Sequence, residues 1–313
     1  MRVRSLCRLL ALLALVAFGG SVLADERVSQ PYVGITYIDR TEASPRAVHM
    51  HIVRIDLTAP GLRFKLSPPS GAREVVRQTT LEYLKQERAQ VAVNAHFFLP
   101  YPSNDADVWL VGIAASEGRV YSAFEIPKQD YALVANAPGL NVDRANHASI
   151  VHRASPRRDG RRVLEPVRLW TTLAGSAQIV TGGVKTVPAY ADSQHVGAPL
   201  RPGGPDNYSN THSWYDAVNA RTAIGLSRDG RTMTVFTVDR TANSRGMQVG
   251  EVADLLMRDY GVWDALNLDG GGSTSLAMQD PVTREPSLIT ASSDNPAGRA
   301  VGSSLAVFAR RRP

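Results

Sequence analysis

The chain has 313 residues, 43% of them hydrophobic and 20% charged, which is enough apolar material for a sizeable core and excludes disorder throughout. The 25 glycines and 19 prolines follow no three-residue period, so a collagen-like chain is excluded as well. The formal net charge is +6, but three of the 35 basic residues fall in the first eight positions, and the other 32 face 29 acidic residues; this near balance argues against a nucleic-acid partner.

Residues 1–24 predict a secretory signal peptide. Its three arginines precede an apolar stretch over residues 9–18, and small residues lead to Ala24, where we expect cleavage. The stretch is shorter than the about 20 residues that span a bilayer, so stable membrane insertion is not expected. The only cysteine, Cys7, lies in this leader. We therefore expect a thiol-free mature chain, residues 25–313, that is periplasmic or secreted.

The next part of the chain predicts strands and one helix. Alternating apolar residues indicate strands over 48–57 and 62–66. Residues 79–88 predict a helix that begins at a capping box. In the first strand, His49 and His51 share one face, for which we favour an exposed polar face over a metal site.

A strand predicted over residues 91–98 carries the first polar residues with a functional interpretation. Val91, Val93 and Phe97 share one face, so Asn94 and His96 lie together on the other. We expect both to contact a substrate. A core histidine with satisfied hydrogen bonds is an equal alternative for His96.

Residues 188–220 are polar and rich in Pro, Gly, Asn and His, which indicates a loop over a site or a flap. After it, residues 221–226 and 232–239 predict a hairpin. An amphipathic helix that begins at Val249 and ends at Gly261 follows. No internal repeat or linker divides the chain, so we expect one domain after the leader.

A strand over residues 265–269 delivers Asp269 into a run of three glycines, which is the strongest functional signal in the chain. Alternation places Asn267 and Asp269 on one face. Glycines leave backbone amides bare, and such surfaces bind phosphate or sugar oxygens. A tight structural turn is the alternative. No lysine follows the glycines as a nucleotide P-loop requires.

No spacing in the chain demands a metal ion or another cofactor. The histidines form no zinc-binding helical pattern. A calcium ion on oxygen ligands such as Asp269 and Asp239 is compatible with the sequence but not required by it.

Four motifs occur in order along the chain, and their list reads Asn-Ala-His-Phe-Phe at 94–98, Arg-Thr-Ala-Ile-Gly at 221–225, Ser-Arg-Gly-Met at 244–247 and Asn-Leu-Asp-Gly-Gly-Gly-Ser-Thr at 267–274. With them the sequence resembles the phosphodiester glycosidase family, over residues 91–308. The resemblance implies a mixed α/β catalytic domain that hydrolyses a sugar-1-phosphate diester and releases the sugar. Many relatives have two glycines where this chain has Ala95 and His96.

Chemistry and resemblance together give a candidate site. Cleavage of a glycosyl phosphate needs a carboxylate beside the anomeric carbon, and cationic donors can stabilise the phosphate that leaves. The catalytic candidates are Asp269, Asp239 and Glu251. The substrate-binding candidates are Asn94, His96, Arg221, Asn267, Gly270, Gly271, Gly272, Ser273, Thr274 and Arg299.

Several of these residues also have a plainer interpretation. Arg221 and Arg299 suit a phosphate clamp because a planar guanidinium grips two oxygens, but each could form a surface ion pair. Asp239 could be a turn acid. Glu251 lies in the first turn of the predicted helix, where any acid favours the helix dipole.

The sequence thus predicts an α+β fold, with mixed or antiparallel sheets flanked by helices in a single catalytic domain. We expect an exported hydrolase of a glycosyl-1-phosphodiester that acts in cell-envelope glycan or exopolysaccharide metabolism. A non-catalytic envelope module that binds glycan is the alternative. The intact carboxylate next to the glycines favours the enzyme.

Overall fold

The structure, a computed structural model, describes residues 24–124, 137–154, 160–187, 215–291 and 295–312. The predicted leader, apart from Ala24, and most of the polar segment 188–220 lie outside the described residues. The described helices are α1 (Thr80–Glu87) and α2 (Val249–Tyr260). Neither is long and apolar enough to cross a membrane.

Strands make up most of the regular structure. In chain order they are β1 (Asp25–Tyr32), β2 (Ile35–Glu42), β3 (Val48–Asp56), β4 (Arg63–Leu66), β5 (Val75–Val76), β6 (Val91–Asn94), β7 (Phe98–Leu99), β8 (Asp107–Leu110), β9 (Ala114–Ser116), β10 (Arg119–Ser122), β11 (Gly139–Val142), β12 (Ala148–Val151), β13 (Thr171–Ala174), β14 (Ala177–Thr181), β15 (Val184–Lys185), β16 (Arg221–Ser227), β17 (Thr232–Val238), β18 (Val262–Asn267), β19 (Leu276–Gln279), β20 (Pro286–Leu288) and β21 (Ser304–Phe308).

All pairings among the described strands are antiparallel. The antiparallel form of the prediction is therefore confirmed, and the fold is richer in sheet than an even mixture of helix and strand would be. The sequence explains the excess of strands. Most of its apolar runs are short and alternate with a period of two, as in strands, and only two segments combine a helical period of 3.6 residues with capping residues. Both of these segments are helices, and both begin with a capping box.

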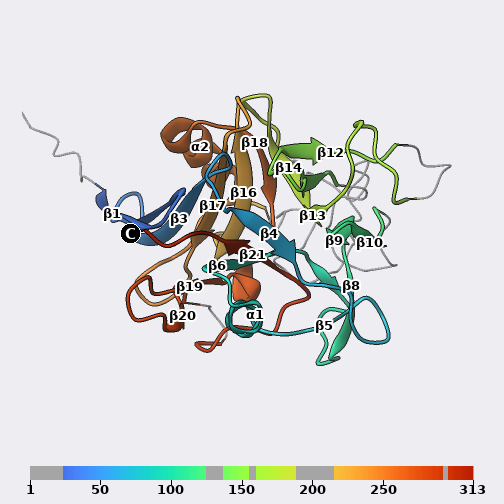
Figure 1. Cartoon of the computed structure of the whole chain (residues 1–313). Coiled ribbons are helices and arrows are strands. Elements are labelled where there is room, and N and C mark those ends of the chain that lie inside the picture. Colours follow the sequence, from blue (N-terminus) through green and yellow to red (C-terminus); the bar gives the residue numbers. More distant parts are fainter. Residues whose placement is uncertain (1–23, 125–136, 155–159, 188–214, 292–294, 313) are drawn as a thin grey trace, which may run out of the picture.

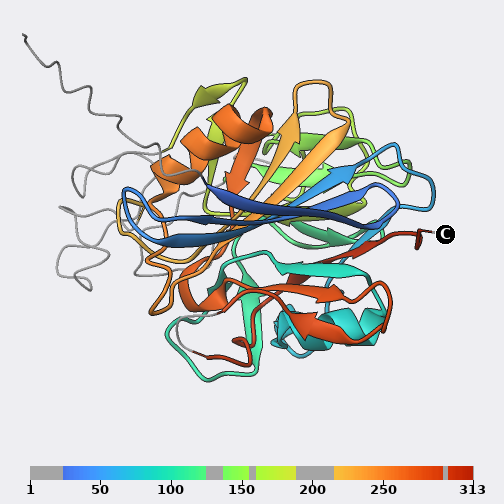
Figure 2. The ribbon, with the colours of Figure 1, turned by 90° about the vertical axis from the view of Figure 1, so that its left-hand side faces the viewer.

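Two sheets and two helices form four stacked layers (Figure 2). The eight-stranded sheet has the order β1-β2-β3-β17-β16-β18-β14-β15, and a five-stranded sheet has the order β20-β19-β6-β21-β4. The core between them is formed by apolar side chains that include Val53, Ile224, Val93 and Leu305. Helix α2 covers the outer face of the larger sheet, and α1 covers the outer face of the smaller one (Figure 1).

Two smaller sheets lie beside this stack. One has the strand order β10-β9-β13-β11-β12, and the other has the order β5-β8-β7. The first packs around its own apolar cluster, which includes Ile113, Phe124 and Leu169. Strands β9 and β13 also contact β4, so this sheet is attached to the edge of the five-stranded sheet.

Two predicted strands end earlier than expected. The strand predicted over 91–98 is β6, which stops at Asn94, and β7 begins only at Phe98. The strand predicted over 265–269 is β18, which stops at Asn267. In both places the strand ends because the next backbone groups form hydrogen bonds between the two sheets. The Asp269 amide, after β18, donates to the Ala95 carbonyl, after β6, at 3.0 Å.

Residues 268–275 carry the chain from the eight-stranded sheet to the five-stranded one, and the Asn94 side chain holds this crossover. The Asn94 Nδ2 donates to the Asp269 carbonyl at 2.6 Å. The Asn94 Oδ1 accepts from the Thr222 hydroxyl at 2.8 Å and from the Ser275 amide at 3.0 Å. Asn94 is fully buried, so these bonds have no competition from water.

Asn94→Ala should therefore destabilise the fold strongly. The substitution leaves three buried groups without their partner, and each costs about 1 to 3 kcal/mol, so we expect a loss of at least about 3 kcal/mol in the free energy of unfolding. Urea unfolding followed by circular dichroism measures it. Thr222→Val removes only one of the three bonds and should cost about 1 kcal/mol. Equal effects of the two substitutions would contradict the role given to Asn94.

Candidate active site

Asp269 lies in the crossover between the two sheets, with only 8% of its surface exposed. Its amide and its carbonyl are both bonded to the end of β6, through Ala95 and Asn94. The preceding residue, Leu268, still donates from its amide to the Thr222 carbonyl in β16 at 2.9 Å. The backbone of Asp269 is thus fixed by both sheets, and this fixes where the carboxylate starts.

The glycines after Asp269 are required by close backbone contacts. A Cβ on Gly270 would lie 2.9 Å from the Ala220 carbonyl oxygen. Gly271 has a φ of +59°, and its amide donates to the same carbonyl at 2.8 Å. Residues Gly271–Ser273 form one 3₁₀ turn. The structural turn that the sequence left as an alternative is therefore present, and it directs Ser273 back to Asp269.

Ser273 and Arg299 form the polar side of the Asp269 carboxylate. The Ser273 side chain is hydrogen-bonded to the Asp269 carboxylate. Arg299 Nη1 donates to the Ser273 hydroxyl oxygen at 3.2 Å. The Arg299 guanidinium also stands 5.7 Å above the ring of Tyr101, which is partly exposed. Of the two arginines expected at the site, Arg299 is thus beside the carboxylate.

A second arginine, Arg77, is near enough for its charge to act on the same carboxylate. Its guanidinium lies 4.9 Å above the Phe98 ring. Arg77 Nε donates to the Ala300 carbonyl and Nη1 donates to the Ser103 carbonyl, both at 2.9 Å. These bonds fix the plane of the guanidinium, and its charge acts on Asp269. The sequence analysis did not find Arg77.

Burial dominates the electrostatics of this carboxylate. It raises the pKa of Asp269 to about 7, although the Ser273 hydrogen bond, the charges of Arg299 and Arg77 and the Gly270 amide all lower it. Burial and the charge of Arg299 in turn lower the pKa of Arg77. Asp269 therefore titrates near neutral pH, where a carboxyl group is most effective in exchanging a proton.

Asn94 and Asn267, from which we expected substrate contacts, both make structural contacts. The Asn94 amide holds the crossover, as described above. Asn267 is buried, and its Nδ2 donates to the Ser176 hydroxyl at 3.0 Å and to the Leu268 carbonyl at 3.1 Å. Both side chains thus orient the loop that carries Asp269.

His96 is in the core, as its alternative interpretation required. Its Nε2 accepts from the Ala174 amide at 2.9 Å, and its Nδ1 lies 2.8 Å from the Ser303 hydroxyl. Burial lowers the pKa of His96 to about 4, so the ring is neutral at physiological pH. The alternation argument placed it on a substrate-binding face, but the strand has already ended at this position.

Arg221 is fully buried at the start of β16. Its Nε donates to the Met247 carbonyl at 3.0 Å, and its Nη2 donates to the Ala217 carbonyl. These contacts hold the residues that lead into α2 against the sheet. The described contacts of Arg221 are thus those of a structural anchor.

The other two catalytic candidates lie apart from the Asp269 contacts. Asp239 follows β17 at the same edge of the sheet, but β16 separates β17 from β18, which corresponds to about 10 Å at usual strand spacing. Glu251 closes the capping box of α2 by accepting from the Gln248 amide at 2.7 Å, and it pairs with Arg46. Glu251 thus has the structural role that the sequence left open, as an acid in the first turn of α2.

Gly272 and Thr274 complete the loop, and both are buried. Within the described residues, the Thr274 hydroxyl has no hydrogen-bond partner.

The sequence identified the loop and Arg299, but missed Arg77 and Tyr101. Arg77 precedes α1 and lies in no motif, while Phe98, under its guanidinium, is the last residue of the first motif.

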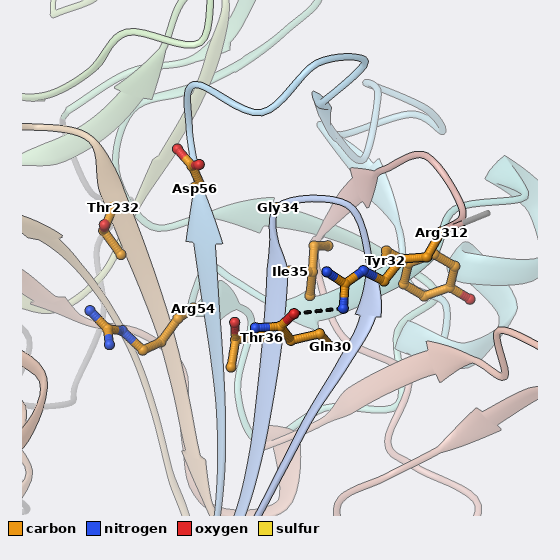
Figure 3. A pocket seen from close by; sticks show the side chains of 9 residues that line it. All are labelled: Gln30, Tyr32, Gly34, Ile35, Thr36, Arg54, Asp56, Thr232 and Arg312. Atoms are coloured by element: carbon orange, nitrogen blue, oxygen red, sulfur yellow. Dashed lines mark hydrogen bonds between the residues drawn. The ribbon is translucent and has the colours of Figure 1, made fainter.

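A separate depression lies at the other end of the eight-stranded sheet (Figure 3). Its lining comprises Gln30, Tyr32, Gly34, Ile35, Thr36, Arg54, Asp56, Thr232 and Arg312. In β17, Thr232 pairs with Asp56 at this end, whereas Val238 pairs with Arg221 next to the crossover. The depression is therefore remote from Asp269 and forms no part of the candidate site.

Comparison with known proteins adds to this geometry. A sequence profile described as phosphodiester glycosidase matches residues 87–308. The N-acetylglucosamine-1-phosphodiester alpha-N-acetylglucosaminidase of mouse is 36% identical over 85 residues, which cover 26% of this chain and 16% of the mouse protein. The human enzyme of that name is 36% identical over 72 residues, 23% of this chain and 14% of the human protein. The matched segments thus span less than a fifth of either relative.

Two solved structures share the fold. The catalytic domain of the zebrafish N-acetylglucosamine-1-phosphodiester alpha-N-acetylglucosaminidase, auto-inhibited by its pro-peptide, is similar with a TM-score of 0.58 at 19% identity, over 93% of this chain and 85% of that one. A protein of Burkholderia pseudomallei is similar with a TM-score of 0.61 at 14% identity, over 95% and 98% of the two chains. At these identities the likeness concerns the fold alone.

The raised pKa of Asp269 predicts a pH-dependent cost to stability. Below about pH 4 the carboxyl is neutral in the folded and unfolded states, so it costs nothing. As the pH rises towards 7, ionisation favours the unfolded state, and the cost reaches at most about 4 kcal/mol. Asp269→Asn should therefore gain in melting temperature over the parent between pH 4.5 and pH 8, measured by scanning calorimetry.

Asp229→Asn is the matched control for this titration. Asp229 lies in the turn between β16 and β17, where hydrogen bonds from Ser227 and the Arg231 amide lower the pKa of its carboxyl. Its contribution has the opposite sign and is lost only as the pH falls below the pKa of an unfolded aspartate, so the difference in melting temperature between this variant and the parent should stay constant from pH 4.5 to pH 8. The same trend in both variants would show that Asp269 is not buried as described.

Proposed function

The chain belongs to the phosphodiester glycosidase family, and we propose that it hydrolyses a glycosyl phosphodiester, releasing the sugar from its phosphate. One observation carries the proposal. A buried carboxylate, Asp269, stands in the family's glycine motif with two arginine side chains beside it. This combination fits a reaction at an anomeric carbon with an anionic leaving group.

The geometry supports a division of roles. Asp269, in its ionised form, acts at the anomeric carbon, as a nucleophile or as a base that takes a proton from water. The bond between that carbon and the phosphate oxygen breaks, and its electron pair stays with the phosphate. Arg77 and Arg299 bind the phosphate oxygens and stabilise the charge that develops there. Much of the usual acid catalysis is then unnecessary.

The environment of these groups favours catalysis over mere binding. Burial keeps water away, which strengthens the attraction between the arginines and an anionic substrate. The aromatic rings of Phe98 and Tyr101 hold both guanidinium groups in place, and Tyr101 has an exposed part that a sugar ring can contact. A pKa near 7 lets Asp269 change protonation state during the reaction.

We further propose that the protein is exported and acts on cell-envelope glycans or exopolysaccharide. The basic and apolar pattern of residues 1–24 supports export. Amino-terminal sequencing of the protein from its host tests this, since the expected mature chain starts at Asp25 and a start at Met1 would contradict export.

Asp269→Asn tests the catalytic role. The substitution keeps size but removes the charge, so kcat/KM for a phosphodiester substrate should fall about a thousandfold or more, on the order of 4 kcal/mol. In the parent, kcat/KM should decrease as the pH falls below about 7, because Asp269 becomes protonated. Released sugar, identified by mass across a panel of glycosyl phosphodiesters, is the measurement.

Two results would contradict this assignment. A folded Asp269→Asn variant with parental activity would remove the carboxylate from the reaction. A parent protein that binds glycans saturably but releases no sugar from any member of the panel would favour the non-catalytic envelope module.

Arg77→Lys tests the second arginine. Lysine keeps the charge but loses the planar guanidinium that the Ala300 and Ser103 carbonyls hold in place, so we expect kcat/KM to fall by roughly 1 to 3 kcal/mol of transition-state stabilisation. Arg73→Lys is the matched control, because Arg73 also stands over an aromatic ring, that of Trp109, and pairs with Asp105. If both variants lose activity equally, Arg77 does not bind the phosphate specifically.

A further inference from the structure

A group of histidine and aspartate side chains outside the candidate active site lies on three neighbouring strands. Asp39 in β2 is directly opposite His51 in β3. His49 is two residues away on the same face of β3, and the Asp239 amide, just after β17, donates to its carbonyl at 3.0 Å. The register of the sheet thus brings two imidazoles and two carboxylates together.

Each histidine has one nitrogen bonded to a partner at hydrogen-bond distance. His49 Nε2 lies 2.6 Å from Asp39 Oδ1. His51 Nδ1 lies 2.8 Å from the Tyr37 hydroxyl. Contacts of this kind orient histidines that bind metal ions through their other nitrogen.

The other nitrogens approach the same oxygen of Asp239. His51 Nε2 is within long hydrogen-bond distance of Asp239 Oδ2, at 3.3 Å, and His49 Nδ1 is 3.5 Å from the same oxygen. Both separations exceed the about 2.7 to 2.9 Å of a hydrogen bond between charged partners. They match the distance of about 3.3 Å between two ligands on a tetrahedral metal ion with bonds of about 2.0 to 2.1 Å.

The charge of this group also favours a bound cation. Asp239 and His51 are almost completely buried. Asp239 Oδ1 accepts from the Ala291 amide at 3.0 Å, which leaves Oδ2 to the histidines. Among the described residues, no lysine or arginine pairs with Asp39 or Asp239. A buried carboxylate is costly unless it is paired or binds a metal ion.

These observations correct the interpretation of the two histidines as part of an exposed polar face. His51 is 2% exposed, because β3 is an inner strand of the eight-stranded sheet. The ligand-type atoms of Asp39, His49 and His51 lie within 4.8 Å of one another. Periodicity gave the shared face, but not the carboxylates that the neighbouring strands bring to it.

We propose that His49, His51 and Asp239 bind one divalent transition-metal ion, of which Zn²⁺ is the best fit, and that Asp39 orients His49 from the other side of its ring. Imidazole nitrogen with carboxylate oxygen suits Zn²⁺ and its neighbours in the first transition row, whereas calcium and magnesium take oxygen ligands. The ion connects β3 to the segment after β17, and Asp39 adds β2 through its bond to His49. It stabilises the end of the eight-stranded sheet from which the crossover also leaves, but it takes no part in the chemistry of Asp269.

Metal binding to the full chain tests the proposal directly. The purified protein is stripped with a chelator and titrated with Co²⁺, whose visible spectrum reports nitrogen and oxygen ligation, and then with Zn²⁺ in competition with a chromogenic chelator. We expect one equivalent of each ion per chain. We also expect Zn²⁺ to raise the melting temperature, because it binds the folded state.

Two variants test which residues form the site. Both are at partly exposed positions, so the substitutions leave the buried core intact. His49→Gln and Asp39→Asn should each weaken Zn²⁺ binding at least tenfold and alter the Co²⁺ spectrum. His147→Gln is the matched control, because His147 also pairs with an aspartate, Asp143, but stands alone and exposed. This control should bind Zn²⁺ like the parent. Circular dichroism at 20 °C checks that each variant is folded.

The possible results decide the matter. Saturable binding of one ion that His49→Gln weakens and His147→Gln does not would support the site. Absence of saturable binding by the folded parent would overturn it, as would equal binding by the parent and the folded His49→Gln variant. Neither result depends on hydrolytic activity, so the outcome is independent of the function proposed for Asp269.

Discussion

The arrangement of the candidate active site depends on the burial of one carboxylate inside a crossover between two sheets. Asp269 can occupy this place because its backbone is bonded to both sheets, through Asn94, Ala95 and the residue before it. The glycines that follow allow the chain to approach the start of β16 more closely than a side chain would permit. The glycines of the motif therefore permit the backbone path of the loop, and this path positions the carboxylate.

Burial has the largest effect on the pKa of Asp269. Two arginines and a serine favour the charged form of Asp269, yet desolvation raises its pKa to about 7. Such a group opposes folding at neutral pH, and the crossover tolerates this because Asn94 and Asn267 satisfy the polar groups around it. The ionised form of Asp269, which the proposed hydrolysis requires, is thus also the form that opposes folding.

Local patterns predicted local structure well. The capping box at Thr79 and Glu82 marks the start of α1, and the hairpin of β16 and β17 forms around the Asp229–Gly230 turn. The failures occur where partners are distant in sequence. Arg77 reaches the site from the segment before α1, and no spacing rule connects it to Asp269. His96 is in the core because the strand that should have exposed it ends at Asn94.

The sequence by itself determined several strands, both described helices and the loop that carries Asp269, because capping, alternation and glycine requirements act over a few residues. Only the tertiary structure decided which polar residues meet. Arg299 and Arg77 come from opposite ends of the chain, and Asp39, His51 and Asp239 come from three strands whose register no single segment encodes. Charge, burial and distance between such residues are properties of the packed sheets, so they appear only when the sheets are assembled.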